Sequence, residues 1–269
     1  MTVTKSYRYD WNTVWQYSTN YHDHQYIWIP SWSRYDSYDE YKVGSGWNYD
    51  RYEVINYYFL RILIVKRLEE GEMDMLRLTH VTLKTRQVIL QDADFIFKKG
   101  RIYGLLAING SGKTTLFRAI RNLIPISSGN IAVSPSLFYY ESVEWLDGNL
   151  SGIDYLRLIK NIWKSDLNLR DEIDYWEMSD YISLPIRKYS LGMKQRLVIA
   201  MYFLSQAKCW LMDEITNGLD EYYRQKFFDR LTEIDRQEQL VLLSSHYKEE
   251  LVDVCDRVVT IHQGQIEEV

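Results

Sequence analysis

Residues 104–115, with the sequence GLLAINGSGKTT, combine the residue types that hold a phosphate group. The apolar run 102–108 predicts a buried strand, and the spacing of apolar residues in 116–120 predicts a helix. Between them lies a turn of small polar residues. Its backbone N–H groups can surround phosphate oxygens, and the helix N-terminus adds positive potential. The turn is formed by Asn109, Gly110, Ser111 and Gly112.

Three side chains follow this turn at the start of the expected helix. Lys113 is expected to reach the terminal phosphates of a nucleotide, and the hydroxyl of Thr114 to bind Mg²⁺, with Thr115 beside it in the same motif. The phosphate-loop pattern has a glycine where this chain has Ala107. The alternative is a glycine turn between a strand and a helix that holds no ligand.

A pair of adjacent carboxylates, Asp213 and Glu214, ends the apolar strand expected over residues 209–212. Asp213 is suited to hold Mg²⁺, directly or through water, beside Thr114. Glu214 points the other way by alternation and is suited to polarise a water molecule aimed at a γ-phosphate. Such a pair alone is more often a solvated turn, but a phosphate loop about one hundred residues earlier favours the chemical interpretation.

Three further motifs occur around this pair in a characteristic order. The first, YSLGMKQRL at residues 189–197, places Ser190 as a helix N-cap and Gly192 where the backbone can be approached closely. Residues 217–220 (NGLD) and 244–246 (SSH) follow. Together with the phosphate loop, these motifs resemble those of ATP-binding cassette (ABC) proteins over residues 75–269. The signature variant looks most like ATPase subunits of bacterial exporters for bacteriocins, peptides or antibiotics.

The resemblance implies an ATPase that uses ATP and Mg²⁺. In the family, two nucleotide-binding domains pair head to tail, and Ser190 and Gly192 of one would face the phosphate loop of the other. Glu214, His246 and Lys113 would be the catalytic residues, with His246 contacting the γ-phosphate and the attacking water. Asp220 would link the two sites. The alternatives are a turn residue for Asp220 and a strand-end histidine for His246.

The chain departs from the family pattern at several positions. The glutamine that senses Mg²⁺ corresponds to Glu141, or to Ser142 if the alignment shifts by one residue. Residues 82–88 contain no aromatic side chain to stack on adenine, so Lys84 or Arg86 would have to cover the base by a cation–π contact. Three other family residues are replaced: the first signature glycine, the signature's last glutamine, and the proline after the catalytic glutamate are Leu191, Met193 and Ile215.

Strand and helix patterns alternate along residues 75–269, which predicts an α/β fold with a mainly parallel sheet. The family resemblance implies a P-loop NTPase of ABC type: a mixed sheet core, an antiparallel β subdomain and a small helical subdomain over about 148–188. Expected strands are 76–81, 88–90, 93–97, 101–107, 131–133, 137–140, 209–212, 240–243 and 257–262, with a loop over 124–130. Expected helices are 114–122, 153–178, 193–204, 222–236 and 248–254.

Residues 1–72 differ in composition from the domain expected over 73–269. They hold 12 of the 23 tyrosines and 5 of the 9 tryptophans, and before Val54 they contain few of the aliphatic residues that fill the core of a sheet. They are open to three interpretations: a small aromatic binding module, a poorly ordered tail, or a mis-assigned translation start. The last is supported by residues 69–72 (EEGE), which back-translate to a purine-rich run just before Met73. Met73 or Met75 would then be the natural start, and residues 57–68 would form a short helix if translated.

Charge and composition restrict the partners. The net charge of −5 offers no basic field for nucleic acid. Two cysteines cannot form a disulfide framework and suit a reducing compartment, and no apolar stretch approaches the roughly 20 residues that span a bilayer. The resemblance therefore implies a separate polytopic permease and a second nucleotide-binding domain as partners. It implies a cytoplasmic location, peripheral on the inner face of the cell membrane.

The sequence leaves other functions open. One is a nucleotide-dependent regulator or other non-transport ATPase of the same superfamily, although the two cassettes or long coiled-coil insertions usual in such proteins are missing here. Another is a catalytically weak partner in an asymmetric dimer, suggested by Ala107 and by the missing adenine-stacking aromatic. Neither the substrate nor the direction of transport is encoded in a nucleotide-binding domain, because the permease selects the cargo.

Overall fold

The computed structural model describes residues 4–9, 13–18, 76–106, 110–234 and 238–269. The chain divides into two units, Met1–Trp47 and Asn48–Val269. In the first unit, β1 (Thr4–Tyr9) and β2 (Thr13–Ser18) form an antiparallel pair in which Thr4 lies opposite Ser18. The expected start at Met73 or Met75 and the expected helix over 57–68 lie outside the described residues.

The core of the second unit is a six-stranded sheet in the order β11-β10-β5-β9-β8-β7. The strands from β10 to β7 are parallel, and only β11 runs antiparallel to its neighbour. The central strands are short, continuous apolar runs because both faces of the sheet are covered. The strands are β5 (Arg101–Leu106), β7 (Leu137–Tyr139), β8 (Cys209–Asp213), β9 (Leu240–Ser245), β10 (Arg257–His262) and β11 (Gln265–Glu268).

A second sheet of three antiparallel strands has the order β4-β3-β6. It contains β3 (Leu76–Lys84), β4 (Val88–Phe97) and β6 (Ser128–Val133). β3 alternates buried and exposed side chains over much of its length, as expected for a sheet with one face on the core. The expected fold class, a mixed sheet core with an antiparallel β subdomain, is confirmed.

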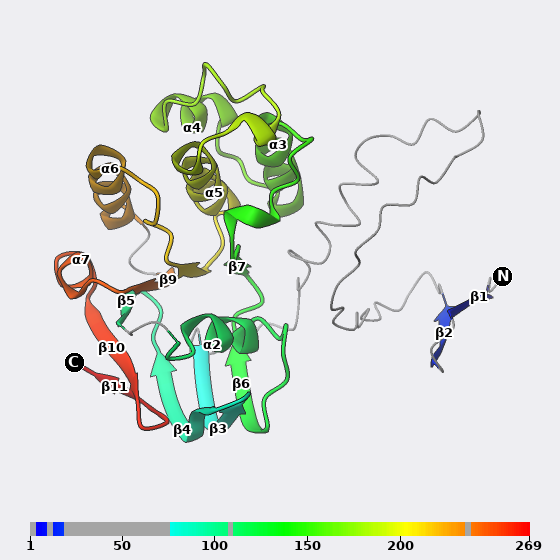
Figure 1. Ribbon diagram of the computed structural model, residues 1–269, viewed down its shortest axis with the longest axis vertical. Coiled ribbons are helices and arrows are strands. Elements are labelled where there is room, and N and C mark those ends of the chain that lie inside the picture. Colours follow the sequence, from blue (N-terminus) through cyan, green and yellow to red (C-terminus); the bar gives the residue numbers. More distant parts are fainter. Residues whose placement is uncertain (1–3, 10–12, 19–75, 107–109, 235–237) are drawn as a thin grey trace. The chain divides into compact units, whose positions relative to one another are not determined.

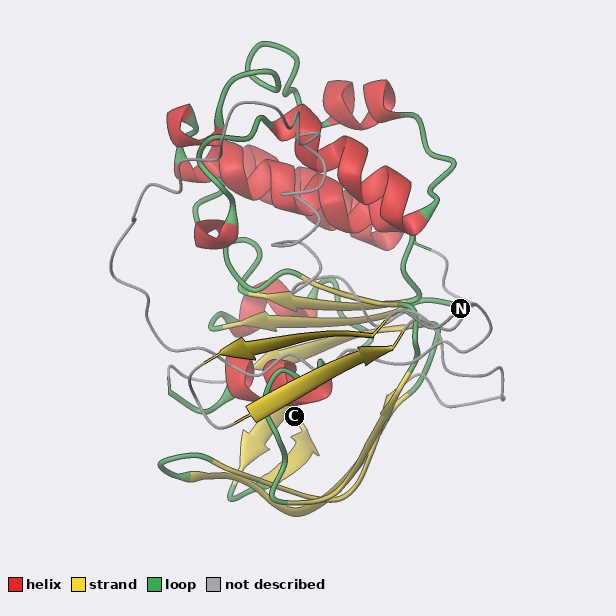
Figure 2. Cartoon of the chain, turned by 90° about the vertical axis from the view of Figure 1, so that its right-hand side faces the viewer, coloured by secondary structure: helices red, strands yellow, loops and turns green. Residues whose placement is uncertain are grey.

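Helices α3, α4 and α5 lie together on one side of the sheets (Figure 1, Figure 2). Side-chain caps fix several helix starts: Ser151 caps α3, Ser190 caps α5 and Asp220 caps α6. No helix among the described residues is long and apolar enough to cross a membrane. The helices are α2 (Lys113–Ile120), α3 (Gly152–Trp163), α4 (Leu169–Tyr175), α5 (Leu191–Ser205), α6 (Glu221–Thr232) and α7 (Lys248–Val252), with 3₁₀ turns at Val143–Trp145 and Ile186–Lys188.

Two apolar cores meet at the six-stranded sheet. One lies between this sheet, the antiparallel sheet and α2, and is filled by side chains such as Phe97 and Phe117. The other joins the sheet to α5 and the surrounding helices, and includes Trp176 and Trp210. Because the two cores cover opposite sides of the same strands, the loops at the ends of these strands are held in fixed relative positions.

Polar contacts also tie α4 to α6. Arg230 forms a bidentate ion pair with the buried carboxylate of Glu172. Just after α4, the carboxylate of Glu177 accepts hydrogen bonds from Lys226 Nζ (2.8 Å) and Tyr222 Oη (2.8 Å). These bonds lower the pKa of Glu177 to about 2, so it stays ionised and the link persists at neutral pH.

Several element boundaries expected from sequence are wrong. Residues 88–97 form one strand rather than two, because Asp92 adopts a positive φ of 48° as a local irregularity and the pairing with β3 continues past it. The helix expected over 153–178 is divided at Lys164, whose φ is 53°, into α3 and α4. β6 begins at Ser128, inside the expected loop, and α6 ends at Thr232. β11 was not expected at all.

Candidate functional site

The phosphate loop connects β5 to α2, as the sequence predicts. Gly110 and Gly112 have φ values of 80° and 100°, in the region that glycine adopts without strain. A Cβ atom on Gly112 would lie 2.6 Å from Ile89 Cγ2, so no larger residue fits there without a shift. Asn109 and Ala107 lie outside the described residues.

Thr114 and Asp213 meet directly at the start of α2. Thr114 Oγ1 donates to Asp213 Oδ2 at 2.5 Å, and Ser244 Oγ donates to Asp213 Oδ1 at 2.6 Å. The backbone N–H of Glu214 in turn donates to Ser244 Oγ at 3.0 Å. Ser244 was recognised only as part of a motif, but it pairs with Asp213 in the β8–β9 register and holds the Asp213 carboxylate and the Glu214 backbone.

Asp213 carries a charge in a largely enclosed position. Its pKa is raised above the usual 3.8, chiefly by desolvation, while the bonds from Ser244 and Thr114 partly offset this. A buried carboxylate that is short of positive charge favours a cation nearby. This is a property expected of a residue that holds a metal–nucleotide complex.

We predict that Asp213→Asn stabilises the nucleotide-free protein. Because the folded-state pKa is raised, protonation favours the folded form, and this contribution is lost as pH rises through the folded-state pKa. At pH 7 a neutral amide therefore removes the desolvation cost of the ionised carboxylate. We expect a gain of about 1 kcal/mol, or about 2–4 °C in Tm.

Thermal unfolding of the two proteins at pH 4.5 and at pH 7 measures this effect. The difference between them should widen at pH 7, and the same experiment with ATP and Mg²⁺ should stabilise only the wild type. Asp180→Asn, at an exposed turn residue, is the control. A variant less stable than wild type at pH 7 without nucleotide would contradict the argument.

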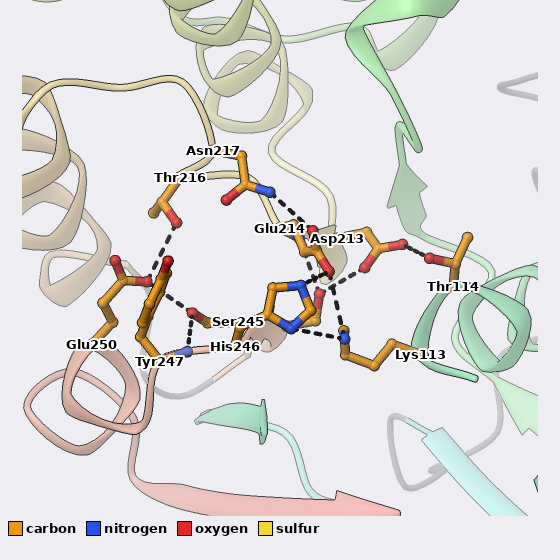
Figure 3. A network of polar contacts seen from close by, with 11 residues as sticks. Lys113, Thr114, Asp213, Glu214, Thr216, Asn217, Ser245, His246, Tyr247 and Glu250 are labelled. Atoms are coloured by element: carbon orange, nitrogen blue, oxygen red, sulfur yellow. Dashed lines mark hydrogen bonds and ion pairs between the residues drawn. The ribbon is translucent and has the colours of Figure 1, made fainter. Parts of the chain in front are cut away.

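Lys113, Glu214 and His246 form a triangle of charged and polar groups (Figure 3). Glu214 Oε1 lies 3.5 Å from Lys113 Nζ and 2.5 Å from His246 Nε2, and His246 Nδ1 lies 3.3 Å from Lys113 Nζ. The Lys113 side chain is only 5% exposed. Each group comes from a different element, α2, the end of β8 or the end of β9, so the parallel sheet brings together residues more than 130 positions apart.

The two adjacent carboxylates have separate surroundings, as the alternation predicted. Asp213 faces Thr114 and Ser244, whereas Glu214 faces Lys113 and His246. Glu214 has a φ of 50°, so the chain turns sharply just after β8 ends. A carboxylate beside a histidine and a lysine can accept a proton from water while the cation neutralises charge that develops on a phosphate.

The residues present fit Mg²⁺ held together with a nucleotide. Thr114 and Asp213 supply hard oxygen ligands, which Mg²⁺ prefers. Among the described residues, no group of three histidine, cysteine or acidic side chains could hold a metal by itself. Mg²⁺ is commonly bound by one or two protein ligands plus substrate phosphates rather than by a protein cage, which is the arrangement this donor set allows.

Glu141, the residue expected at the Mg²⁺-sensing position, follows β7 and lines a cavity of about 330 Å³ with Thr114 and Asp213. Both of its carboxylate oxygens are engaged by Arg118, and Tyr139 also donates to it. The structure therefore places Glu141 beside the expected metal position but pairs it with an arginine that sequence analysis did not single out.

The signature residues (189–197) and the NGLD segment at 217–220, here called the D-loop, have local structural roles. Ser190 Oγ accepts from the N–H of Met193 at 3.2 Å, and Asp220 Oδ1 accepts from the N–H of Tyr223 at 3.0 Å, so each caps a helix. A Cβ on Gly192 would lie 3.0 Å from the carbonyl oxygen of Gly218, which explains a glycine there. The structure thus brings Gly192 against the D-loop, whereas Ser190 and Asp220 begin α5 and α6.

Sequence analysis missed three hydrogen bonds near the catalytic groups, one of which joins the D-loop to Glu214 (Figure 3). Asn217 Nδ2 donates to Glu214 Oε2 at 2.9 Å. On α7, Glu250 accepts from Ser245 Oγ at 2.8 Å and from Thr216 Oγ1 at 3.5 Å. Thr216, Asn217 and Ser245 could have been suspected because they lie within or beside the motifs in the sequence. Glu250 could not, because no motif surrounds it.

Comparison with known proteins adds independent support. Residues 90–217 match the family model described as ABC transporter. The protein YybJ of Bacillus subtilis, described as an uncharacterized ABC transporter ATP-binding protein, is 31% identical over 208 residues, which cover 72% of this chain and 94% of YybJ. The capsule polysaccharide export ATP-binding protein CtrD of Neisseria meningitidis is 30% identical over 200 residues, covering 71% and 92%.

Similarity to solved structures supports the fold. A structure described as the ATP binding subunit of an ABC transporter superposes with a TM-score of 0.63 at 23% identity, covering 72% of this chain and 89% of its own. This chain contains the phosphate loop, the paired carboxylates and the histidine at one site. Its sequence matches the ATP-binding proteins YybJ and CtrD over most of their length. The chain belongs to the ATP-binding proteins of ABC transporters.

Proposed function

We propose that this protein hydrolyses ATP at the site formed by Lys113, Thr114, Asp213, Glu214 and His246 to drive export through a separate membrane permease. The observation that carries the proposal is the triangle in which Glu214 lies 2.5 Å from His246 and 3.5 Å from Lys113. This triangle lies at the N-terminus of α2, where the phosphate loop places a terminal phosphate.

Each side chain has a distinct role in this proposal. Lys113 binds the terminal phosphates. Thr114 and Asp213 would hold Mg²⁺, which would neutralise phosphate charge. Glu214 accepts a proton from the attacking water. His246 orients this water and contacts the γ-phosphate. Ser244 keeps Asp213 and the backbone of Glu214 in place through its two hydrogen bonds.

The proposed active unit contains two nucleotide-binding domains. Ser190 and Gly192 would complete the site of the partner domain, and the N-terminus of α5 would contribute its positive dipole end to the bound nucleotide. In one chain, Ser190 lies at an exposed helix start beside exposed Leu191, a position open to such a contact. The helical region over about 148–188 is proposed to dock on the permease, which would place the protein at the inner face of the cell membrane.

The cargo is the least constrained part of the proposal. The signature sequence at residues 189–197 favours export of a peptide, bacteriocin or antibiotic. Two relatives with a named cargo favour a surface polymer instead: CtrD, and a teichoic acids export ATP-binding protein of Listeria monocytogenes that is 28% identical over 66% of this chain and 55% of its own. Because sequence similarity extends over most of CtrD, we favour a cell-envelope polymer.

A gene-replacement experiment tests export and cargo together. A strain lacking the protein is complemented with wild type or with Glu214→Gln, and surface polysaccharide, teichoic acid and tolerance to antimicrobial peptides are measured. We expect loss of surface polymer that only wild type restores. A change confined to peptide tolerance would favour the peptide cargo, and no change in any readout would contradict export.

A further inference from the structure

Arg118 projects from α2 one helical turn after Thr114 and forms a forked ion pair with Glu141. Its Nε donates to Glu141 Oε2 at 2.6 Å, and a second guanidinium nitrogen donates to Oε1. The Glu141 side chain is 9% exposed, whereas that of Arg118 is 45% exposed. The carboxylate is therefore enclosed, and the arginine reaches it from the solvent side.

A second donor fixes the same carboxylate. Tyr139, at the end of β7, is buried and donates to Glu141 Oε2 at 3.1 Å. Its ring packs edge-on against Phe117, the neighbour of Arg118 on α2, with centroids 6.0 Å apart. Arginine and tyrosine thus hold Glu141 in one orientation, Tyr139 from the core beneath α2 and Arg118 from the solvent side.

The need for this support follows from the charges around the cavity. Glu141, Asp213 and Glu214 all line the cavity of about 330 Å³, which also borders Thr114. Glu141 thus adds a third negative charge beside a site that must accept a polyanionic nucleotide. A bidentate arginine pair neutralises that charge and occupies both carboxylate oxygens.

We propose that Arg118 is a positioning residue of the ATPase site, which clamps Glu141 so that this carboxylate does not bind a divalent cation before the nucleotide arrives. Because both carboxylate oxygens of Glu141 accept hydrogen bonds from Arg118, they are poor ligands for a metal ion. Without Arg118, an enclosed carboxylate bonded only to Tyr139 and lacking its ion pair would share the cavity with Asp213 and Thr114, giving the oxygen-rich surroundings that divalent cations bind. The expected effect on catalysis rests on the proposed ATPase function, whereas the expected change in divalent-cation affinity does not.

Binding of Mn²⁺ to nucleotide-free protein, followed by electron paramagnetic resonance, tests the clamp without any ATPase measurement. For Arg118→Met we expect the dissociation constant for Mn²⁺ to fall at least 10-fold. In the double variant Arg118→Met/Glu141→Gln it should return to within about 2-fold of wild type, because the carboxylate released by the loss of Arg118 is then absent. Arg118→Lys keeps the charge without the fork and should lie between the two.

A matched control is Arg170→Met, which removes an exposed arginine paired with Asp174 at 3.7 Å on α4. This variant should bind Mn²⁺ as the wild type does. An unchanged Mn²⁺ affinity in Arg118→Met and Arg118→Lys would overturn the proposal, and so would a gain that persists in the double variant. If the clamp also serves catalysis, excess Mg²⁺ should inhibit the ATPase of Arg118→Met at concentrations that leave wild type unaffected.

Discussion

Replacing Lys113 with alanine is expected to weaken ATP binding by about 100-fold or more. The Lys113 side chain is 5% exposed, and its ammonium group lies where α2 begins, 3.5 Å from Glu214 and 3.3 Å from His246. Two charge-assisted hydrogen bonds to phosphate, at about 1.5–3 kcal/mol each, amount to at least about 3 kcal/mol, or about two orders of magnitude in Kd.

Titration with a fluorescent ATP analogue in the presence of Mg²⁺ measures this effect. Lys99→Ala is a suitable control, because it also removes a lysine paired with a glutamate, Glu238 at 3.2 Å, in the exposed turn before β5. The control should bind as wild type does. A Kd for Lys113→Ala within 3-fold of wild type would show that the phosphates bind elsewhere, and the assignment of the loop would have to be withdrawn.

The sequence predicts the residues that would contact nucleotide and metal better than it predicts the residues that hold them in place. Lys113, Thr114, Asp213 and Glu214 could be found because short motifs impose their spacing, and each motif sits at the end of a recognisable apolar strand. The Arg118–Glu141 pair could not be found in this way. Its members come from a helix face and a strand end, and only the packing of α2 on the sheet brings them together.

Element boundaries failed where single residues adopt unusual backbone conformations. Positive φ values at Asp92 and Lys164 let a strand continue and a helix stop where apolar periodicity indicated the opposite. β11 was missed because its hairpin turns at Gln263 and Gly264, both with positive φ, and glutamine is not among the residues that announce such a turn. Patterns of apolar residues indicate burial. They did not predict the continuity of β4, the end of α3 or the β10–β11 hairpin, because these depend on local backbone geometry.

Replacing Glu214 with glutamine is expected to lower the rate of ATP hydrolysis by about 10²–10⁴-fold while leaving ATP binding nearly unchanged. The amide preserves the size of the side chain and the hydrogen bond with Asn217, but it cannot accept a proton. Lys113 and Thr114 are untouched, so the phosphates remain held. The variant should therefore accumulate with ATP bound, and if the proposed head-to-tail pairing is right, it should form an ATP-dependent dimer in size-exclusion chromatography.

The comparison with other variants separates catalysis from structure. Glu267→Gln, on exposed β11, makes the same chemical change away from the site and should hydrolyse ATP as wild type does. His246→Ala should lose activity too, because the group 2.5 Å from the Glu214 carboxylate would no longer orient the water. If wild type and Glu214→Gln hydrolyse ATP equally slowly even with the permease present, Glu214 is not the base, and the chain would act as a binding partner in an asymmetric pair.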